Sequence, residues 1–309
     1  MRGNRLRWVA VIFSILFCSR VVWAEESKTI EVWKNLFTFT HGKGANSNTT
    51  FLVTKEGVIV IDTGVTPAEA RKAKEAVRKQ TQLPILYIIN TNYHGDHSFG
   101  NQVFKDSHTI IAHENVRKAL TQESGKEYLA FFKTLKIPGM EETVITPPNM
   151  IFKDKMHIYA GEYHLELIHM PGYTDGDLFI YIEALKTLIT GDLIFNGKVP
   201  DMGDAYIDDW TKALNYMGDL DAEIYIPGHG DPGGKPILIA MKHYLFELRQ
   251  RVVRQIEKGS SLKETQNVVG PMLKEKYRSW QNLERIDGNI ERAYKEFSCL
   301  LYTSPSPRD

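Results

Sequence analysis

The segment Pro84–Ile89 constrains the fold of this chain more than any other feature. It is a short, wholly apolar run of the kind found in strands that are buried on both faces. A helical pattern over Glu69–Lys79 precedes it, and Pro67 stands at the first turn of that helix, where proline is favoured. Helix and buried strand therefore alternate here, which is typical of an α/β domain.

The same alternation continues along the chain in two successive halves. The predicted helices cover 113–135 and 208–220, the pair Pro147–Pro148 marks a loop, and the residues from Pro236 to Phe297 form an amphipathic helical tail. Strands interleaved with helices, without a low-complexity linker, predict one layered α/β domain over residues 25–298. The remaining predicted strands are Phe37–Thr40, Thr50–Val53, Val58–Ile61, Met156–Tyr159, Tyr163–Ile168, Phe179–Ile182, Leu188–Thr190 and Ile224–Ile226.

Residues 1–24 have the pattern of an export signal. Basic residues precede an apolar run that ends at Cys18, and small residues stand at Val22 and Ala24, where a signal peptidase cleaves. A membrane anchor is the alternative, but a spanning helix needs about 20 apolar residues and this run is shorter. We therefore expect cleavage after Ala24, a periplasmic or secreted protein, and no stable membrane insertion.

The last residues, 299–309, differ in composition from the charged helical pattern before them. One back-translation of this segment resembles a sequencing adapter, so we interpret it as a non-native tail and expect it to contribute nothing to the fold. Because the two cysteines are Cys18 and Cys299, the domain between them would contain no disulfide, thiolate ligand or cysteine nucleophile.

Charge gives no indication of a nucleic-acid partner. Loss of the signal changes 38 basic and 38 acidic residues to 34 and 38, because four arginines and no acid are removed. No segment carries the concentrated basic face of nucleic-acid binding. We expect a small-molecule substrate, and the sequence leaves the oligomeric state open.

Metal-ligating residue types follow the buried strand directly. The run Asn92-Tyr93-His94-Gly95-Asp96-His97 places two imidazoles and one carboxylate close together, and these are suitable donors for zinc. Four further motifs stand near the ends of predicted strands: Asp62-Thr63-Gly64, Pro171-Gly172-Tyr173-Thr174, Gly191-Asp192 and Pro227-Gly228-His229-Gly230.

In this order, the motifs resemble those of the metallo-β-lactamase superfamily over about residues 29–235. The resemblance implies an α/β fold, specifically a four-layer αβ/βα sandwich. The stretches Thr174–Asp177 and Gly191–Phe195 are most similar to periplasmic zinc metallohydrolases of the branch associated with quinoprotein and sulfur-oxidation systems.

The family holds two metal ions, and the resemblance implies that one of the two sites is complete in this chain. Its ligands would be Asp96, His97, Asp192 and His229, which predicts one zinc ion. The other site should have three histidines, but this sequence offers Asn92, His94 and Tyr173. An amide is a poor donor, and a phenol with a pKa of about 10 must lose its proton before it binds metal. We therefore expect this degenerate first site to be empty.

The residues around the ligands can be given roles on the same basis. His94 or Asp96 would act as general base on a water beside the substrate carbonyl. Asp62 is expected to orient a ligand from behind, and His169 is expected to be a packed or supporting histidine instead of a replacement ligand. Tyr173 and Phe195 would line a substrate pocket or belong to the core.

Two functions remain open at this stage. The first is a metal-dependent hydrolase of an ester, lactone, thioester or amide bond, with a β-lactam among the candidates. The second is a catalytically degenerate family member that binds a metabolite or a partner protein. The complete second site favours the enzyme, whereas the missing ligands of the first favour the binding module, and the substrate depends on loops that one sequence does not give.

Overall fold

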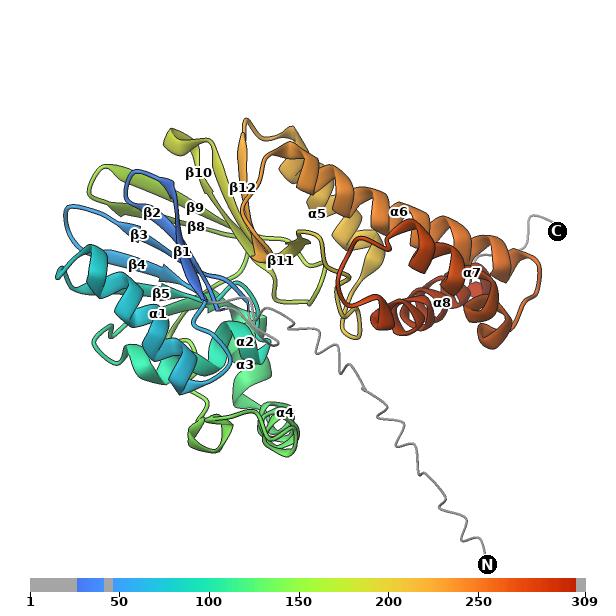
Figure 1. The fold of residues 1–309 in the computed structure, drawn as a ribbon, viewed down its shortest axis with the longest axis horizontal. Helices are drawn as coiled ribbons and strands as arrows, with labels where there is room; N and C mark the ends of the chain where they lie inside the picture. Colours follow the sequence, from blue (N-terminus) through green and yellow to red (C-terminus); the bar gives the residue numbers. More distant parts are fainter. Residues whose placement is uncertain (1–26, 42–46, 304–309) are drawn as a thin grey trace, which may run out of the picture.

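The computed structural model describes residues 27–41 and 47–303, without the side chains of 300–303 (Figure 1). The predicted signal peptide, residues 1–24, lies outside the described residues, as does the end of the predicted tail, 304–309. None of the helices within the described ranges is long and apolar enough to cross a membrane.

Seven strands form the first sheet, in the order of the chain. The first four pair antiparallel, and the parallel part begins where β4 meets β5. The apolar segment Pro84–Ile89 contains β5, which lies between β4 and β6 in this sheet. The strands are β1 (Lys28–Trp33), β2 (Leu36–Thr40), β3 (Thr49–Val53), β4 (Val58–Ile61), β5 (Ile85–Ile89), β6 (Ile110–His113) and β7 (Met150–Phe152).

The second sheet has five strands, in the order β12, β11, β10, β9, β8. All its pairings are antiparallel except that of β11 with β12. Apolar side chains from both sheets, such as Ile59 and Ile89 in the first and Leu167 and Ile226 in the second, form one buried cluster. The strands are β8 (Lys155–Ala160), β9 (Tyr163–His169), β10 (Leu178–Ile182), β11 (Thr187–Phe195) and β12 (Ile224–His229).

Helices cover the outer face of each sheet (Figure 1). On the first sheet, α1 (Pro67–Gln80) buries Ala73 and Val77 in a cluster with strand residues, and Thr66 caps its N-terminus. On the second, α5 (Ile207–Asp219) and α6 (Lys235–Glu257) share one large cluster with β10, β11 and β12. The layers run helix, sheet, sheet, helix, so the predicted four-layer αβ/βα sandwich is confirmed.

The helix predicted over 113–135 is divided in the structure. Its first residue, His113, ends β6, and its ring accepts a hydrogen bond from Asn115 N at the start of α3 (Glu114–Thr121). A second helix, α4 (Glu123–Thr134), follows because Gln122 has extended backbone angles between them. The strands β6 and β7 are also absent from the prediction, because they are defined by the pairing of β6 with β5 and β7 and not by a repeating pattern in the sequence.

The predicted helical tail is three helices: α6, α7 (Leu262–Lys276) and α8 (Ile286–Thr303). Gly259 (φ 76°) turns the chain after α6, and Ser261 with Glu264 forms a reciprocal N-terminal cap on α7. Helix α8 continues to Thr303, so the change of composition at 299 does not coincide with the end of the helix.

Candidate metal centre

Four strand ends carry the predicted metal-site residues to one edge of the sandwich. Asp62 directly follows β4, Asp192 lies in β11, and His229 ends β12. Asp96 and His97 belong to the short helix α2 (Gly95–Ser98) in the loop after β5. Since β4 and β5 are parallel, as are β11 and β12, their carboxyl ends meet, and residues far apart in the sequence become neighbours.

Two glycines make this close approach possible. A Cβ on Gly228 would lie 2.2 Å from Asp192 Oδ1, and one on Gly191 would lie 2.5 Å from the Thr91 hydroxyl. Gly191 also has φ 50°, a left-handed conformation that favours glycine, at a register shift in the pairing of β11 with β12. Asp192 therefore owes its position to the glycines around it.

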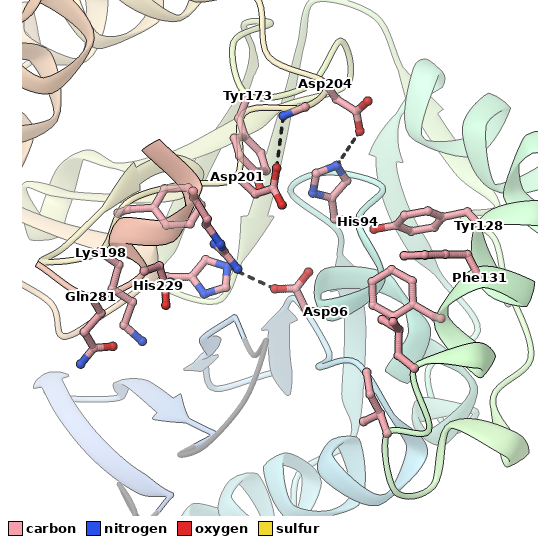
Figure 2. Close-up of a pocket in the computed structure, with 17 residues that line it drawn as sticks. His94, Asp96, Tyr128, Phe131, Tyr173, Lys198, Asp201, Asp204, His229 and Gln281 are labelled. Atoms are coloured by element: carbon pink, nitrogen blue, oxygen red, sulfur yellow. Dashed lines mark hydrogen bonds and ion pairs between the residues drawn. The ribbon is translucent and has the colours of Figure 1, made fainter. Parts of the chain in front are cut away.

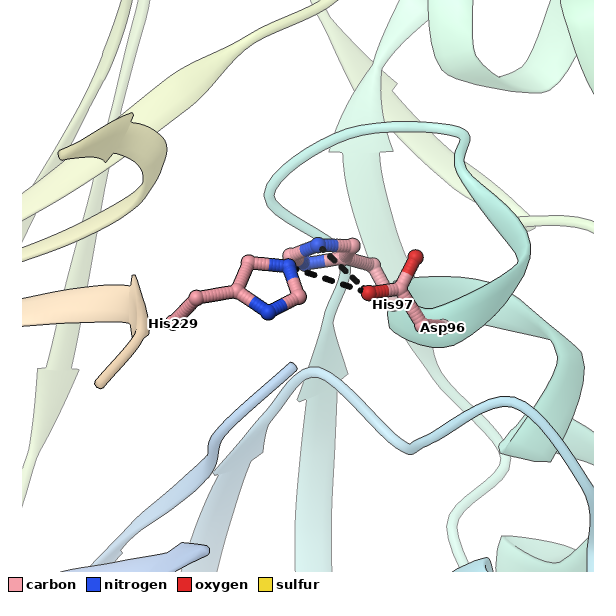
Figure 3. A group of neighbouring side chains, drawn as sticks. All are labelled: Asp96, His97 and His229. Atoms are coloured by element: carbon pink, nitrogen blue, oxygen red, sulfur yellow. Dashed lines mark ion pairs between the residues drawn. The ribbon is translucent and has the colours of Figure 1, made fainter. Parts of the chain in front are cut away.

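The predicted ligands converge on one point. His229 Nε2 lies 3.1 Å from Asp96 Oδ2 and 3.3 Å from Asp192 Oδ1. His97 Nε2 lies 2.9 Å from Asp192 Oδ2 and 3.6 Å from Asp96 Oδ2. Figure 3 shows Asp96, His97 and His229 facing one another, and one donor atom from each lies within 4.8 Å of the other two. The donor set, two imidazoles and two carboxylates, is suited to zinc.

Two donor atoms in this cluster are buried without a hydrogen-bond partner among the described residues, His97 Nε2 and Asp192 Oδ1. The short distance between His97 and Asp192 is therefore not a well-aligned hydrogen bond. Buried polar atoms without partners are costly, and a metal ion would satisfy both. The residues present thus fit a metal centre.

Asp62 fixes the orientation of His97 through Nδ1, the ring nitrogen that does not face the other ligands. Its Oδ2 lies 2.8 Å from His97 Nδ1, and it accepts hydrogen bonds from Thr91 N at 2.8 Å and Thr91 Oγ1 at 2.7 Å. A carboxylate that accepts the Nδ1 proton leaves the Nε2 lone pair for the cluster, which is the usual support of a metal-bound histidine.

The electrostatics of the cluster also favour a cation. Burial lowers the pKa of His97, but the carboxylates of Asp192, Asp62 and Asp96 together raise it well above its ordinary value. Conversely, burial raises the pKa of the Asp96 carboxyl, while His97 and His229 hold it below its ordinary value overall. The site therefore attracts positive charge, and a proton and a metal ion would compete for it.

The residues of the degenerate first site lie together beside this cluster, but Asn92 and His94 bond to other groups and Tyr173 keeps its proton. Asn92 Nδ2 donates to Asp192 Oδ2 at 3.3 Å, and Asn92 Oδ1 accepts from His94 N at 2.8 Å. His94 Nε2 lies 3.0 Å from Asp204 Oδ2. Burial and the carboxylates of Asp192 and Asp96 raise the pKa of Tyr173 well above its ordinary value, so its phenol keeps its proton.

His169 lies apart from the cluster. Its Nδ1 is 2.8 Å from the carbonyl oxygen of Asp177, and its ring stacks on His113 at a centroid distance of 3.5 Å. Among the described residues it makes no hydrogen bond or ring contact with a predicted ligand. It is the last residue of β9 and packs against His113 at the end of β6.

A cavity of about 370 Å³ opens over the cluster (Figure 2). Tyr173 and Phe195, considered from the sequence as possible pocket residues, both line it. Several other lining residues were missed, because no motif surrounds them and their positions depend on loops and on the C-terminal helices. They are Tyr128, Phe131, Phe132, Leu135, Ile137, Lys198, Asp201, Gly203, Asp204, Gln281, Asn282 and Arg285.

The sequence profile described as "Metallo-beta-lactamase superfamily" matches residues 42–229, more than half of the chain. The chain belongs to this superfamily. All four predicted ligands and the three residues of the degenerate first site fall inside the matched region, whereas α6, α7 and α8 lie beyond it.

The names of similar proteins in the metallo-β-lactamase superfamily describe different enzymes. The chain is 24% identical to the metallo-beta-lactamase type 2 of Bacillus sp. (strain 170), over 71% of this chain and 84% of that protein. It is 21% identical to the linear primary-alkylsulfatase of Pseudomonas sp. (strain ATCC 19151), over 66% of this chain but only 46% of that protein. This chain thus corresponds to less than half of the alkylsulfatase.

A solved structure shows the same fold over a larger share of the chain. The stereoselective inverting sec-alkylsulfatase from Pseudomonas sp. aligns with a TM-score of 0.67 and 17% identity, over 92% of this chain and 52% of that one. A metallo-beta-lactamase from Pontibacter korlensis aligns with a TM-score of 0.59 over 72% of this chain.

Proposed function

We propose that this superfamily member is a periplasmic or secreted hydrolase that holds a single zinc ion and cleaves an ester, lactone, thioester or amide bond. The observation that carries the proposal is a pair of buried atoms that form no hydrogen bond with a described residue, His97 Nε2 and Asp192 Oδ1, within a cluster of two histidines and two aspartates. The signal-like residues 1–24 support export.

Asp96, His97, Asp192 and His229 would hold the metal. When bound there, zinc supplies a Lewis acid that stabilises negative charge on the oxygen of the scissile bond. The chain itself provides the proton acceptor and the walls of the cavity.

His94 is the better of the two general-base candidates. The contact with Asp204 holds its Nε2, and in Figure 2 the other ring nitrogen lies on the cavity side. Burial lowers the pKa of His94, but the hydrogen bond to Asp204 and nearby carboxylates raise it overall, which strengthens it as a base. Asp96, by contrast, faces both His97 and His229 and is needed as a ligand.

Metal analysis combined with hydrolysis assays tests this function. The purified mature protein should contain about one equivalent of zinc and hydrolyse some members of a panel of chromogenic esters and lactams. His94→Gln should keep the metal and lose most of the hydrolysis. The exposed His108 gives a matched control, because His108→Gln removes a histidine outside the cavity and should change neither.

Removal of ligands gives the second arm of the test. His229→Ala with Asp192→Ala should abolish both zinc binding and hydrolysis. Two equivalents of zinc in the wild type, or zinc retained by this double variant, would contradict the proposed ligands. One bound zinc without hydrolysis of any probe would favour the alternative, a degenerate member that binds a metabolite.

A further inference from the structure

One wall of the cavity is cationic. It contains Lys198, from the loop after β11, and Arg285, at the end of the short helix Leu283–Arg285. Both side chains are half-buried, and neither forms an ion pair with a residue in 27–41 or 47–303. Two positive charges that face a cavity without acidic partners are available to an anionic ligand.

Backbone pairing brings these two cations to the same rim. Val199 N donates to Gln281 O at 2.9 Å, and Gln281 N donates to Gly197 O at 2.9 Å. These hydrogen bonds flank Lys198 and tie its loop to the segment that leads to Arg285. Lys198 lies inside the matched region 42–229 and Arg285 lies beyond it, so the C-terminal helical part of this chain completes the wall.

Helix α8 stabilises the same loop further along. Asn289 Oδ1 accepts from Met202 N at 3.2 Å, and its amide nitrogen donates to Pro200 O at 3.0 Å. Asn289 is buried, so these two bonds are shielded from water. Hydrogen bonds on both sides of Lys198 therefore hold the backbone that carries it.

The opposite wall is apolar and comes from α4 and the residues after it. Tyr128 and Phe132 are partly buried against Phe99, whereas Phe131 is 56% exposed and Leu135 is 50% exposed. Large apolar side chains that line a cavity yet remain exposed to water are suited to bind an apolar ligand.

The metal ligands lie between the two walls. In Figure 2, Lys198 and Gln281 lie on one side of His229 and Asp96, and Phe131 and Tyr128 lie on the other. The cavity also contains two acidic groups that have partners of their own. Asp204 is paired with His94, and Asp201 accepts a hydrogen bond from Gly203 N. Figure 2 shows Asp201 next to Tyr173.

We propose that the substrate is an amphipathic monoanion whose scissile ester or thioester lies between an apolar acyl group and a part that carries a carboxylate or similar anion. This inference rests on the proposed function. The acyl group lies along Phe131 and Leu135, and the anion is bound by Lys198 and Arg285. In hydrolysis, water adds to the acyl carbon, the acyl bond breaks, and the proton taken by His94 passes to the departing anionic alcohol or thiol.

Binding of a non-hydrolysable probe tests the two walls without turnover. Calorimetric titration of the zinc-loaded protein should show p-hexyloxybenzoate binding about tenfold more tightly than the uncharged p-hexyloxybenzamide, as expected for one charge-assisted contact. Lys198→Gln with Arg285→Gln should make the two probes bind equally. Lys133→Gln, which removes a charge from α4 outside the cavity lining, should leave the difference unchanged.

The apolar wall has its own comparison. The hexyloxy probe should bind more tightly than p-methoxybenzoate, and Phe131→Ala with Leu135→Ala should remove most of that preference. Equal binding of the charged and uncharged probes in the wild type would overturn the proposal. So would a preference for the anion that survives the double charge variant, because the carboxylate would then be bound by the metal alone.

Hydrolysis of p-hexanoyloxybenzoate and of its neutral methyl ester separates this inference from the proposed function. A lower KM for the anion, lost in the double charge variant, supports both. Preferential binding of the anionic ether with no hydrolysis of either ester would leave the walls as assigned and reject the hydrolase. Hydrolysis of both esters with equal KM would support the hydrolase and reject the assigned walls.

Discussion

Replacement of Asp62 by asparagine should weaken zinc binding through the tautomer of His97. In the structure, Asp62 Oδ1 accepts from Thr91 N, while Oδ2 lies 2.8 Å from His97 Nδ1. If the asparagine oxygen keeps the bond to Thr91 N, its NH₂ group faces His97 Nδ1. That nitrogen must then accept, so the imidazole proton moves to Nε2, where the metal should bind. The backbone favours the test, because Asp62 has φ 58° and asparagine tolerates this region.

The size of the effect follows from the hydrogen bonds that must be lost. To bind zinc in this variant, His97 must carry its proton on Nδ1. Either this N–H faces the NH₂ donor of the new amide at position 62, or that amide turns over and leaves Thr91 N without an acceptor. Asp62, Thr91 and His97 are all buried, and one unsatisfied buried group costs about 1–3 kcal/mol. Zinc affinity should therefore fall by about 10–100-fold, the range found when partners behind metal ligands are removed.

Competition with a chromogenic zinc chelator measures this change. Thr91→Val is the matched control, because it removes the hydroxyl contacts to Asp62 at 2.7 Å and to His97 Nδ1 at 3.2 Å but leaves the contact between Asp62 and His97. It should have little effect on zinc affinity, and thermal unfolding of the metal-free proteins should show that all variants fold. Unchanged affinity in Asp62→Asn, or an equal loss in Thr91→Val, would refute the reasoning.

Two further predictions concern the first site and pH. The double variant Asn92→His with Tyr173→His should still bind about one equivalent of zinc, because Asp204 keeps its contact with His94. Addition of Asp204→Asn weakens that contact and should raise the zinc content towards two equivalents. Elemental analysis of the double and triple variants checks this. Burial and His169 lower the pKa of His113 to about 4, so the stability it contributes above its unfolded pKa of about 6.5 should be lost as pH falls from 6.5 towards 4. His113→Asn, which retains an acceptor for Asn115 N, should flatten this pH dependence in urea unfolding; an unchanged profile would contradict the assigned cause.

Much of the fold could be predicted from the sequence because it depends on local patterns. Apolar runs such as β5 and the alternation of helix and strand give the layers, and β-branched residues make up all of β4 and most of β5. The ligand-bearing motifs could also be found, since each lies in or directly after a strand and combines histidine or aspartate with glycine. His97 and His229 needed no knowledge of packing to be singled out.

Local patterns were insufficient where the structure is held by distant contacts. The helix predicted over 113–135 is interrupted at Gln122, and its first residue, His113, belongs to the short strand β6, which exists because it pairs with β5 and β7. The division of the C-terminal tail into three helices required single residues in left-handed conformations, Gly259 and Asn282.

The sequence by itself determined the superfamily, the layered fold and the identity of the metal-binding residue types, because periodicity and motif order are properties of neighbouring residues. Only the tertiary structure decided the partner of His94 and the two walls of the cavity. Asp204 is 110 positions from His94, and Lys198 lies near Arg285 because its neighbours Gly197 and Val199 form backbone hydrogen bonds with Gln281. Such contacts depend on where loops and helices pack, and no periodicity in the sequence encodes them.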